Sequence, residues 1–256
     1  KLGDLCLKAG EMYTGEQHVR LMRGVNAFRS SQATKHSSLD LWILSAGYGL
    51  IPEEQVIAPY EVTFATMKLK EIDAWSKVVS VPVDFRKLVA KPYDFGLVLL
   101  GDNYLRACQL DDSVKFGGPT ILFCGTGMAK KLPKLANVRV VAISNPEAKR
   151  FSCGLIGLKG ELAARVLASI NGNSKELDSL LDRKTDVLRA LDSAKTAIAV
   201  ARVKKDKVGT KKPKPQTANV ENARRAVANP SVDFVIHLPD SWRNKEHRKR
   251  LRYFIP

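Results

Sequence analysis

The sequence predicts an α/β protein with an open, mostly parallel sheet and helices on both faces of that sheet. Three short apolar runs, at residues 41–44 (LWIL), 95–100 (FGLVLL) and 120–123 (TILF), have the length and composition of buried parallel strands. Residues 138–143 (VRVVAI) form a fourth and less uniform run. Helical patterns lie between the runs, around residues 68–79 and 158–170. This repeated order of strand and helix is typical of parallel sheets.

The chain changes character after residue 172, so that residues 1–172 are expected to form the α/β domain. Residues 173–201 have leucines at three- and four-residue spacing, which predicts one or two amphipathic helices. Residues 202–218 are rich in lysine and proline without apolar periodicity, which is typical of a basic linker. Residues 219–256 form a basic C-terminal segment, in which we expect a short helix at 219–228 and a strand at 232–237.

The charge of the chain predicts a polyanionic partner. The formal net charge is +16 and the pI is about 9.8. Residues 202–256 hold 15 Lys and Arg against 5 Asp and Glu, so that +10 of the net charge lies in this stretch. A modestly basic body with a strongly basic tail fits nucleic-acid binding, and we favour DNA over RNA. The alternative is a basic protein without such a partner.

The cysteines and the apolar runs argue against metal-binding, disulfide-rich and membrane proteins. Cys6, Cys108, Cys124 and Cys153 form no CxxC pair, and the four histidines are scattered, so we expect no metal site, no disulfide framework and no cofactor. The apolar runs are far too short to cross a bilayer, and a signal-peptide pattern is missing. We therefore expect a cytoplasmic protein without membrane association.

The loops that follow the four predicted strands are the expected site, because ligands bind at the carboxyl ends of the strands in such sheets. In the first loop, Gly47 and Gly49 let backbone N–H groups approach a ligand closely, and Tyr48 and Tyr60 can stack on a base or a sugar. Ser45 is a further substrate-binding candidate. The alternative is a tight turn with packed tyrosines.

Carboxylates in two of these loops are the catalytic candidates. Asp102 follows the second strand and can position water or stabilise an oxocarbenium ion. Glu61 offers a second carboxylate beside Tyr60. Asn103 can read a base edge through its amide, and Tyr104 lies next to it. The alternative for Asp102 is a helix cap.

The third and fourth loops and the tail supply candidates for phosphate and base contacts, with a simple turn or a solvated loop or helix as the alternative. The substrate-binding candidates there are Gly125, Thr126, Ser144 and Asn145. The candidates for binding DNA phosphate are Lys130, Lys131, Lys149, Arg150, Lys211, Lys212, Arg243, Arg248, Lys249 and Arg250.

Known catalytic patterns narrow the chemistry further. The sequence contains no Ser–His–Asp order, no HExxH motif and no paired Cys and His set, which argues against a serine hydrolase and a zinc deaminase. An enzyme of this composition would use carboxylate, amide and backbone groups. Cleavage of an N-glycosidic bond can proceed with such groups, because a carboxylate stabilises the positive sugar as the base leaves.

Two stretches resemble known families. Ser45-Ala46-x-Tyr48-Gly49-Leu50, followed by Pro59-Tyr60-Glu61-x-Thr63 and preceded by Tyr13-Thr14-Gly15, resembles the α/β family related to the bacterial peroxide-stress DNA-binding protein. That resemblance extends loosely to about residue 170. Residues 251–256 (LRYFIP) resemble the opening strand of tRNA-guanine-transglycosylase-like proteins from DNA-modification and phage-defence systems.

Together these resemblances imply base-excision or base-exchange chemistry on DNA. The favoured reading is a DNA glycosylase that removes a modified base, a hydrolase activity in phage defence, with Asp102 or Glu61 as the carboxylate. The alternative is a non-catalytic DNA-binding module that delivers substrate to a fused or partner transglycosylase-like domain. An accessory protein of RNA modification is a third reading.

Overall fold

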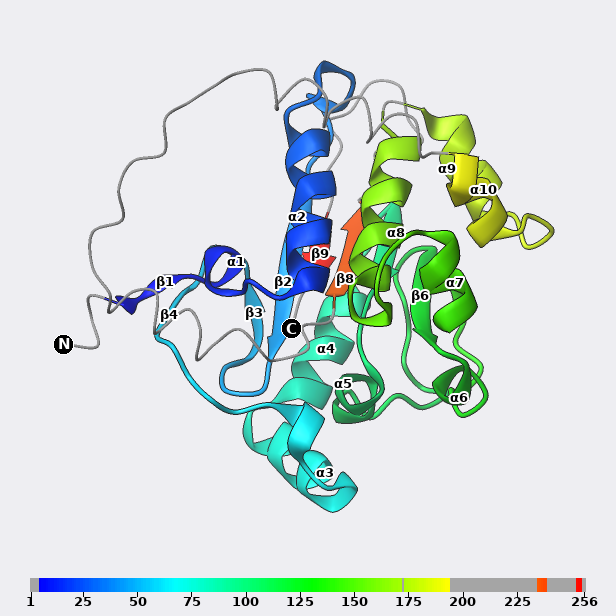
Figure 1. The fold of residues 1–256 in the computed structure, drawn as a ribbon. Coiled ribbons are helices and arrows are strands. Elements are labelled where there is room, and N and C mark those ends of the chain that lie inside the picture. The colour runs from blue at the N-terminus through cyan, green and yellow to red at the C-terminus, as the bar shows by residue number, and fades with distance from the viewer. Residues whose placement is uncertain (1–4, 172, 194–233, 239–251, 255–256) are drawn as a thin grey trace.

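The protein has an α/β fold, shown by a computed structural model that describes residues 5–171, 173–193, 234–238 and 252–254 (Figure 1). The strands are β1 (Leu7–Lys8), β2 (Asp40–Ser45), β3 (Gly49–Pro52), β4 (Val56–Ile57), β5 (Phe95–Val98), β6 (Thr120–Gly125), β7 (Val138–Ile143), β8 (Phe234–Leu238) and β9 (Arg252–Phe254). The α-helices are α1 (Ala9–Met12), α2 (Glu16–Arg29), α3 (Leu69–Val78), α4 (Val81–Val89), α5 (Asp102–Ala107), α6 (Thr126–Ala129), α7 (Asn145–Arg150), α8 (Leu155–Ser169), α9 (Ser174–Leu181) and α10 (Val187–Ser193).

The main sheet is mixed, with the strand order β3-β2-β8-β5-β6-β7 and β9 paired to β8. Strands β5, β6 and β7 are parallel neighbours. Strand β8 is antiparallel to both β2 and β5, so β2 runs in the same direction as the three parallel strands. The four predicted strands therefore share one direction, as expected. They are not four adjacent strands, because β8 lies between β2 and β5.

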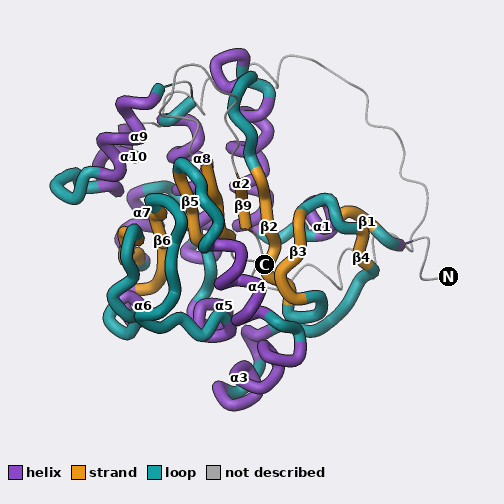
Figure 2. Tube along the Cα trace, turned by 180° about the vertical axis from the view of Figure 1, so that it is seen from behind, coloured by secondary structure: helices purple, strands orange, loops and turns teal. Residues whose placement is uncertain are grey.

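Helices cover both faces of this sheet. Helices α2 and α8 stand side by side over one face, whereas α4 and α5 lie on the other (Figures 1 and 2). Residues of β5 alternate between the two cores, with Phe95 and Leu97 toward α2 and α8 and Val98 toward α4. Each fully buried side chain of this kind contributes roughly 1.5–3 kcal/mol, which explains why this strand is apolar on both faces.

Small residues let α2 and α8 approach each other closely. A Cβ on Gly160 would lie 2.1 Å from the carbonyl oxygen of Gln17, and a Cβ on Gly24 would lie 2.5 Å from the Cα of Ala164. Either substitution would push the helices apart. The close packing thereby positions the N-termini of both helices, which begin at the same edge of the sheet, the lower edge in Figure 1.

The remaining expectations have mixed outcomes. The helical patterns around 68–79 and 158–170 are confirmed as α3 and α8, and the leucine-rich stretch forms two helices, α9 and α10. Both pack into the core beside α8 through Leu177, Leu180 and Leu191. The expected strand at 232–237 corresponds to β8. The linker at 202–218 and the helix at 219–228 lie outside the described residues.

Candidate functional site

The carboxyl edge of the sheet gathers the segments that follow β2, β5, β6 and β7, because these strands share one direction. Helices α2, α5, α6, α7 and α8 begin at this edge. Helix α2 is fixed there by Gln17, whose Nε2 donates to the carbonyl oxygen of Leu99 at 3.3 Å. Since helix N-termini carry partial positive charge, the edge favours anionic or electron-rich ligands.

Three hydroxyl groups form a hydrogen-bonded trio at the end of β2. The Ser45 Oγ donates to the Tyr60 hydroxyl at 2.7 Å, and the Tyr60 hydroxyl is 2.7 Å from that of Tyr13. The Ser45 oxygen is held in turn by the backbone N–H groups of Gly47 and Tyr48, at 3.1 and 3.0 Å. The trio therefore connects the start of α2 with the loop after β2.

The tyrosines of this trio act as hydrogen-bond donors at neutral pH. Burial raises the pKa of Tyr13 well above its ordinary value, with Tyr60 adding to the rise. Burial also raises the pKa of Tyr60, against the hydrogen bonds from Ser45 and Tyr13. One of the two tyrosine protons is used in the bond between them, which leaves the other for an acceptor outside the trio.

Glycines of this loop admit neighbouring groups of the protein itself. A Cβ on Gly47 would lie 2.7 Å from Cδ2 of Tyr60, so the tyrosine ring covers this residue. Gly49 has a φ of +71°, and a Cβ there would lie 2.4 Å from the carbonyl oxygen of Val79. Both glycines thus serve the packing of the loop, which was the alternative to a role in ligand approach.

Tyr48 and Tyr60 meet edge to face, with ring centroids 5.3 Å apart and planes at 79°. The Tyr48 hydroxyl exchanges hydrogen bonds with the backbone N–H and carbonyl of Ala58, both at 3.2 Å. Its side chain is 38% exposed, whereas Tyr60 is half-buried. Of the predicted stacking pair, Tyr48 therefore has the more accessible ring.

Opposite charges lie at the ends of β5 and β6. Asp102, the first residue of α5, is exposed and leans toward β6, since a Cβ on Gly125 would lie 3.5 Å from its Oδ1. Lys159 of α8 is buried and donates from Nζ to the carbonyl oxygen of Leu100 at 2.6 Å. Burial raises the pKa of the Cys124 thiol to about 11, while Lys159 lowers it and Asp102 raises it. Both charges thus lie close to this thiol.

The residues after Asp102 hold a neighbouring turn in place. The Asn103 amide donates to the carbonyl oxygen of Phe64 at 2.8 Å. The Tyr104 hydroxyl is 3.2 Å from Thr63 Oγ1, and its ring meets that of Phe64 edge to face at 5.2 Å. This bond engages the amide nitrogen of Asn103, and the base-reading role expected for this residue stays a prediction. Because Thr63 follows Tyr60 closely in sequence, these contacts connect the trio to the Asp102 loop.

The other predicted residues form no hydrogen bond with the trio or with Asp102 in the part of the chain that the structure describes. Glu61 and Thr126 are exposed. Asn145 is also exposed and is the first residue of α7, the helix that follows the edge strand β7. Ser144 donates from its hydroxyl and its backbone N–H to Glu147, at 2.6 and 2.8 Å, and thereby caps α7. Hydrogen bonding from Ser144 lowers the pKa of Glu147. Ser144 therefore has a capping role in the structure.

The predicted phosphate contacts divide into three groups. Lys130, Lys131 and Lys149 are exposed. Arg150 is paired with Asp192 at 3.2 Å. The tail candidates, Lys211, Lys212, Arg243, Arg248, Lys249 and Arg250, lie outside the described residues.

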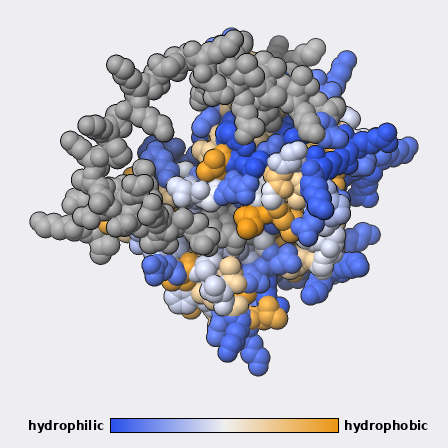
Figure 3. Space-filling model, in the orientation of Figure 1, coloured by the Kyte–Doolittle hydropathy of each residue, from blue (hydrophilic) through white to orange (hydrophobic). Residues whose placement is uncertain are grey.

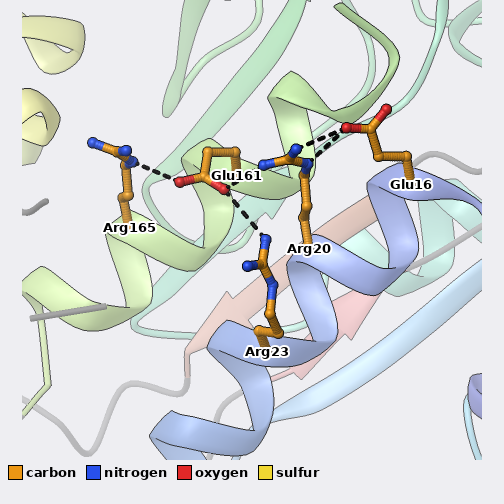
Figure 4. Close-up of polar contacts among 5 residues, drawn as sticks. All are labelled: Glu16, Arg20, Arg23, Glu161 and Arg165. Carbon is orange, nitrogen blue, oxygen red and sulfur yellow. Dashed lines mark hydrogen bonds and ion pairs between the residues drawn. The ribbon is translucent and has the colours of Figure 1, made fainter. Parts of the chain in front are cut away.

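Ion pairs on α2 and α8 extend inward from this edge (Figure 4). Glu161 is buried and accepts from Arg165 at 3.0 Å on its own helix and from Arg20 at 3.0 Å on α2. Arg23 lies 3.5 Å from the same carboxylate. Arg20 also pairs with Glu16 at 2.8 Å. The network fixes the register of the two helices that carry Gln17 and Lys159 near their N-termini.

Tyr13 and Lys159 are two residues of this edge for which the sequence predicted no role. Tyr13 was noted only within the Tyr13-Thr14-Gly15 segment, for its resemblance to a family motif. Lys159 had a usable signal, since it is one of three charged residues, with Glu161 and Arg165, in the mainly apolar helical stretch at 158–170. A charge in such a helix is buried with a partner or points to a site.

This fold and edge define an α/β protein with hydroxyl, carboxylate and ammonium groups gathered at the carboxyl ends of its strands. Residues 7–115, less than half of the 256-residue chain, match the model of a family described only as a family of unknown function (DUF6884). The matched range includes Ser45, Tyr60 and Asp102 but not Lys159. No curated protein and no solved structure matches the chain.

Two features are absent from the described residues, namely metal-binding groups and membrane-spanning helices. Within those residues, groups of three or more His, Cys, Asp or Glu that could hold a metal ion are absent. In the same part of the chain, every helix is too short or too polar to cross a membrane. In the view of Figure 3, hydrophilic side chains cover much of the surface and hydrophobic ones form small separate spots.

Proposed function

We propose that the protein is a DNA-acting enzyme that breaks or exchanges the N-glycosidic bond of a modified base in the cytoplasm, in defence against phage. The observation that supports this proposal is the position of the hydroxyl trio, Asp102 and Lys159 along one edge of the sheet. Hydroxyl donors suit the polar edge of a base, and a carboxylate suits the cationic sugar that forms as the base leaves.

The reaction can be assigned to these groups atom by atom. The bond between the sugar C1′ and the base nitrogen breaks, and a water oxygen bonds to C1′. Asp102 accepts the proton that the water loses, while the departing base nitrogen takes a proton from solvent. The one hydroxyl proton of Tyr13 and Tyr60 that their mutual bond does not use is donated to the base, because burial keeps both hydroxyls protonated.

Binding to DNA is proposed to involve the basic residues outside this edge. A target base must leave the stack to reach the groups at the strand ends. The lysines and arginines of residues 202–218 and 239–251 are proposed to hold the phosphates as a basic extension of the α/β unit. The net charge of +16 supports this assignment.

Alkali-induced strand breakage tests the proposal, because alkali breaks DNA wherever a base has been lost. We expect breaks in phage DNA with modified bases and none in unmodified DNA. Asp102→Asn should reduce breakage by about 100-fold or more while DNA binding persists. Asp112→Asn, a matched loss of an exposed carboxylate in the segment that leads into β6, should retain activity, whereas Glu61→Gln tests the second predicted carboxylate. Binding without breakage on any DNA would contradict the proposal.

The alternative is a non-catalytic DNA-binding module that presents substrate to a transglycosylase-like partner domain. It is favoured by one observation, namely that Asn103 and Tyr104 are committed to holding the turn at Phe64. A module predicts that Asp102→Asn and Glu61→Gln are equally silent. It also predicts that base release appears only when the partner domain is added.

A further inference from the structure

A groove of about 460 Å³ opens between α3, α5 and the segment that follows α6. Its polar lining consists of Asp73, Lys77, Arg106, Gln109 and Lys131. Its apolar lining consists of Leu105, Leu110, Met128, Leu132 and Pro133. The groove is separate from the hydroxyl trio and uses none of its residues.

The charges of the groove favour an anion. Lys77 and Lys131 are exposed and come from opposite walls, α3 and the segment after α6. Arg106 pairs with Asp73 and also donates to the carbonyl oxygen of Leu69 at 3.4 Å, so its guanidinium is held in one position. Three cations against one carboxylate give the lining a net charge of +2.

The apolar wall has the character of a surface for a base or a sugar. Leu105 is buried, while Leu110, Met128 and Leu132 are partly buried against the same core. These side chains are therefore supported from behind and present one side to the groove. An apolar wall with cations at its rim suits a ligand that combines a ring with a phosphate.

Helix α5 leads from the candidate site to the groove. This helix begins with Asp102 and carries Leu105 and Arg106 one turn later, about 6 Å along its axis at 1.5 Å per residue. Helix α6 likewise begins at the carboxyl edge, with Thr126, and contributes Met128 to the groove. A strand with one nucleotide at the edge would reach the groove with its next nucleotides.

We propose that this groove binds single-stranded nucleic acid, namely the nucleotides that flank the one held at the carboxyl edge. A phosphate lies between Lys77 and Lys131, and a base or sugar lies against Met128 and Leu132. The positive charge of the lining and the net charge of +16 on the whole chain favour a polyanion such as nucleic acid as the ligand. The claim that a neighbouring nucleotide is held at the carboxyl edge rests on the proposed function. The claim that the groove binds nucleic acid does not.

Fluorescence anisotropy of the full chain with a short labelled oligothymidylate tests this proposal. The double variant Lys77→Glu with Lys131→Glu should weaken binding by at least about tenfold. It should also reduce the slope of log K against log salt by about 0.7, the value for one lost phosphate contact on a single strand. The matched control is Lys175→Glu with Lys184→Glu, exposed residues in α9 and in the loop that follows it.

The outcomes separate this proposal from the proposed function. Equal losses in the two double variants, or no loss in either, would overturn the groove. Competition by polyglutamate as effective as that by oligothymidylate would also overturn it, in favour of an acidic peptide. If no DNA loses a base while the groove variant alone loses affinity, the groove stands and the glycosidic activity does not.

Discussion

His18 provides a quantitative test of how the start of α2 is held. Its side chain is 3% exposed, and its Nε2 lies 2.7 Å from the carbonyl oxygen of Gly10. Burial lowers the pKa of His18 from 6.5 to about 4, although the hydrogen bond to Gly10 acts in the opposite direction. The folded protein therefore keeps this imidazole neutral at pH values at which the unfolded chain protonates it.

The sign and size of the effect follow from proton linkage. Between pH 6.5 and pH 4 the unfolded chain binds more protons at His18 than the folded protein does, so stability falls as the pH falls through this window. With these two pKa values, the free energy of unfolding should decrease by about 2 kcal/mol from pH 7 to pH 5.

Urea unfolding followed by tryptophan fluorescence at both pH values measures this decrease. His18→Gln removes the titration and retains a side chain that can bond to the Gly10 carbonyl, so its stability should change little between pH 7 and pH 5. His36→Gln, at an exposed position, should keep the full decrease. Equal decreases in wild type and His18→Gln would refute the assignment to His18.

Three further predictions concern packing, charge and thiol chemistry. Gly160→Ala should lower the free energy of unfolding by roughly 1–3 kcal/mol, since its Cβ would lie 2.1 Å from a carbonyl oxygen of the facing helix. Gly127→Ala is the control in the same urea titration. Because open space surrounds Gly127, this change should raise the free energy of unfolding by up to about 1 kcal/mol. Glu161→Gln should cost about 3 kcal/mol because Arg165 stays buried without its carboxylate, and a smaller cost in an Arg165→Met background is the check. Cys124, with a pKa of about 11, should resist iodoacetamide at pH 8 until the protein is unfolded, as measured by mass spectrometry.

Much of the fold follows from local sequence pattern. The runs at 41–44 and 120–123 are strands because their apolar, largely β-branched or aromatic residues fit a sheet covered on both faces, and the run at 138–143 is the partly exposed edge strand β7. Helix α2 was missed because its buried residues include Gln17 and His18, which weaken the apolar periodicity of a 14-residue helix. Polar residues that are buried through specific partners give no such local signal.

The order of strands and the working roles of side chains depend on the tertiary structure. The sequence predicted a strand near residue 232, but nothing local indicated that β8 would pair with both β2 and β5. Similarly, Asn103 and Ser144 follow strand ends as predicted, yet their hydrogen bonds go to Phe64 and Glu147. Which partner an amide or hydroxyl finds is decided by residues distant in sequence.

The position of β8 has a consequence for the order of events during synthesis. Strands β2 and β5 leave the ribosome long before residues 234–238, and each lacks its shared neighbour until those residues arrive. Their backbone N–H and C=O groups then form open edges, which are prone to pair with other chains. The pairings of β8 also join residues almost 200 positions apart, as between Leu41 and Ile236, and such high contact order slows folding. Nascent chains that stall before residue 234 should therefore depend on chaperones far more than the completed protein does.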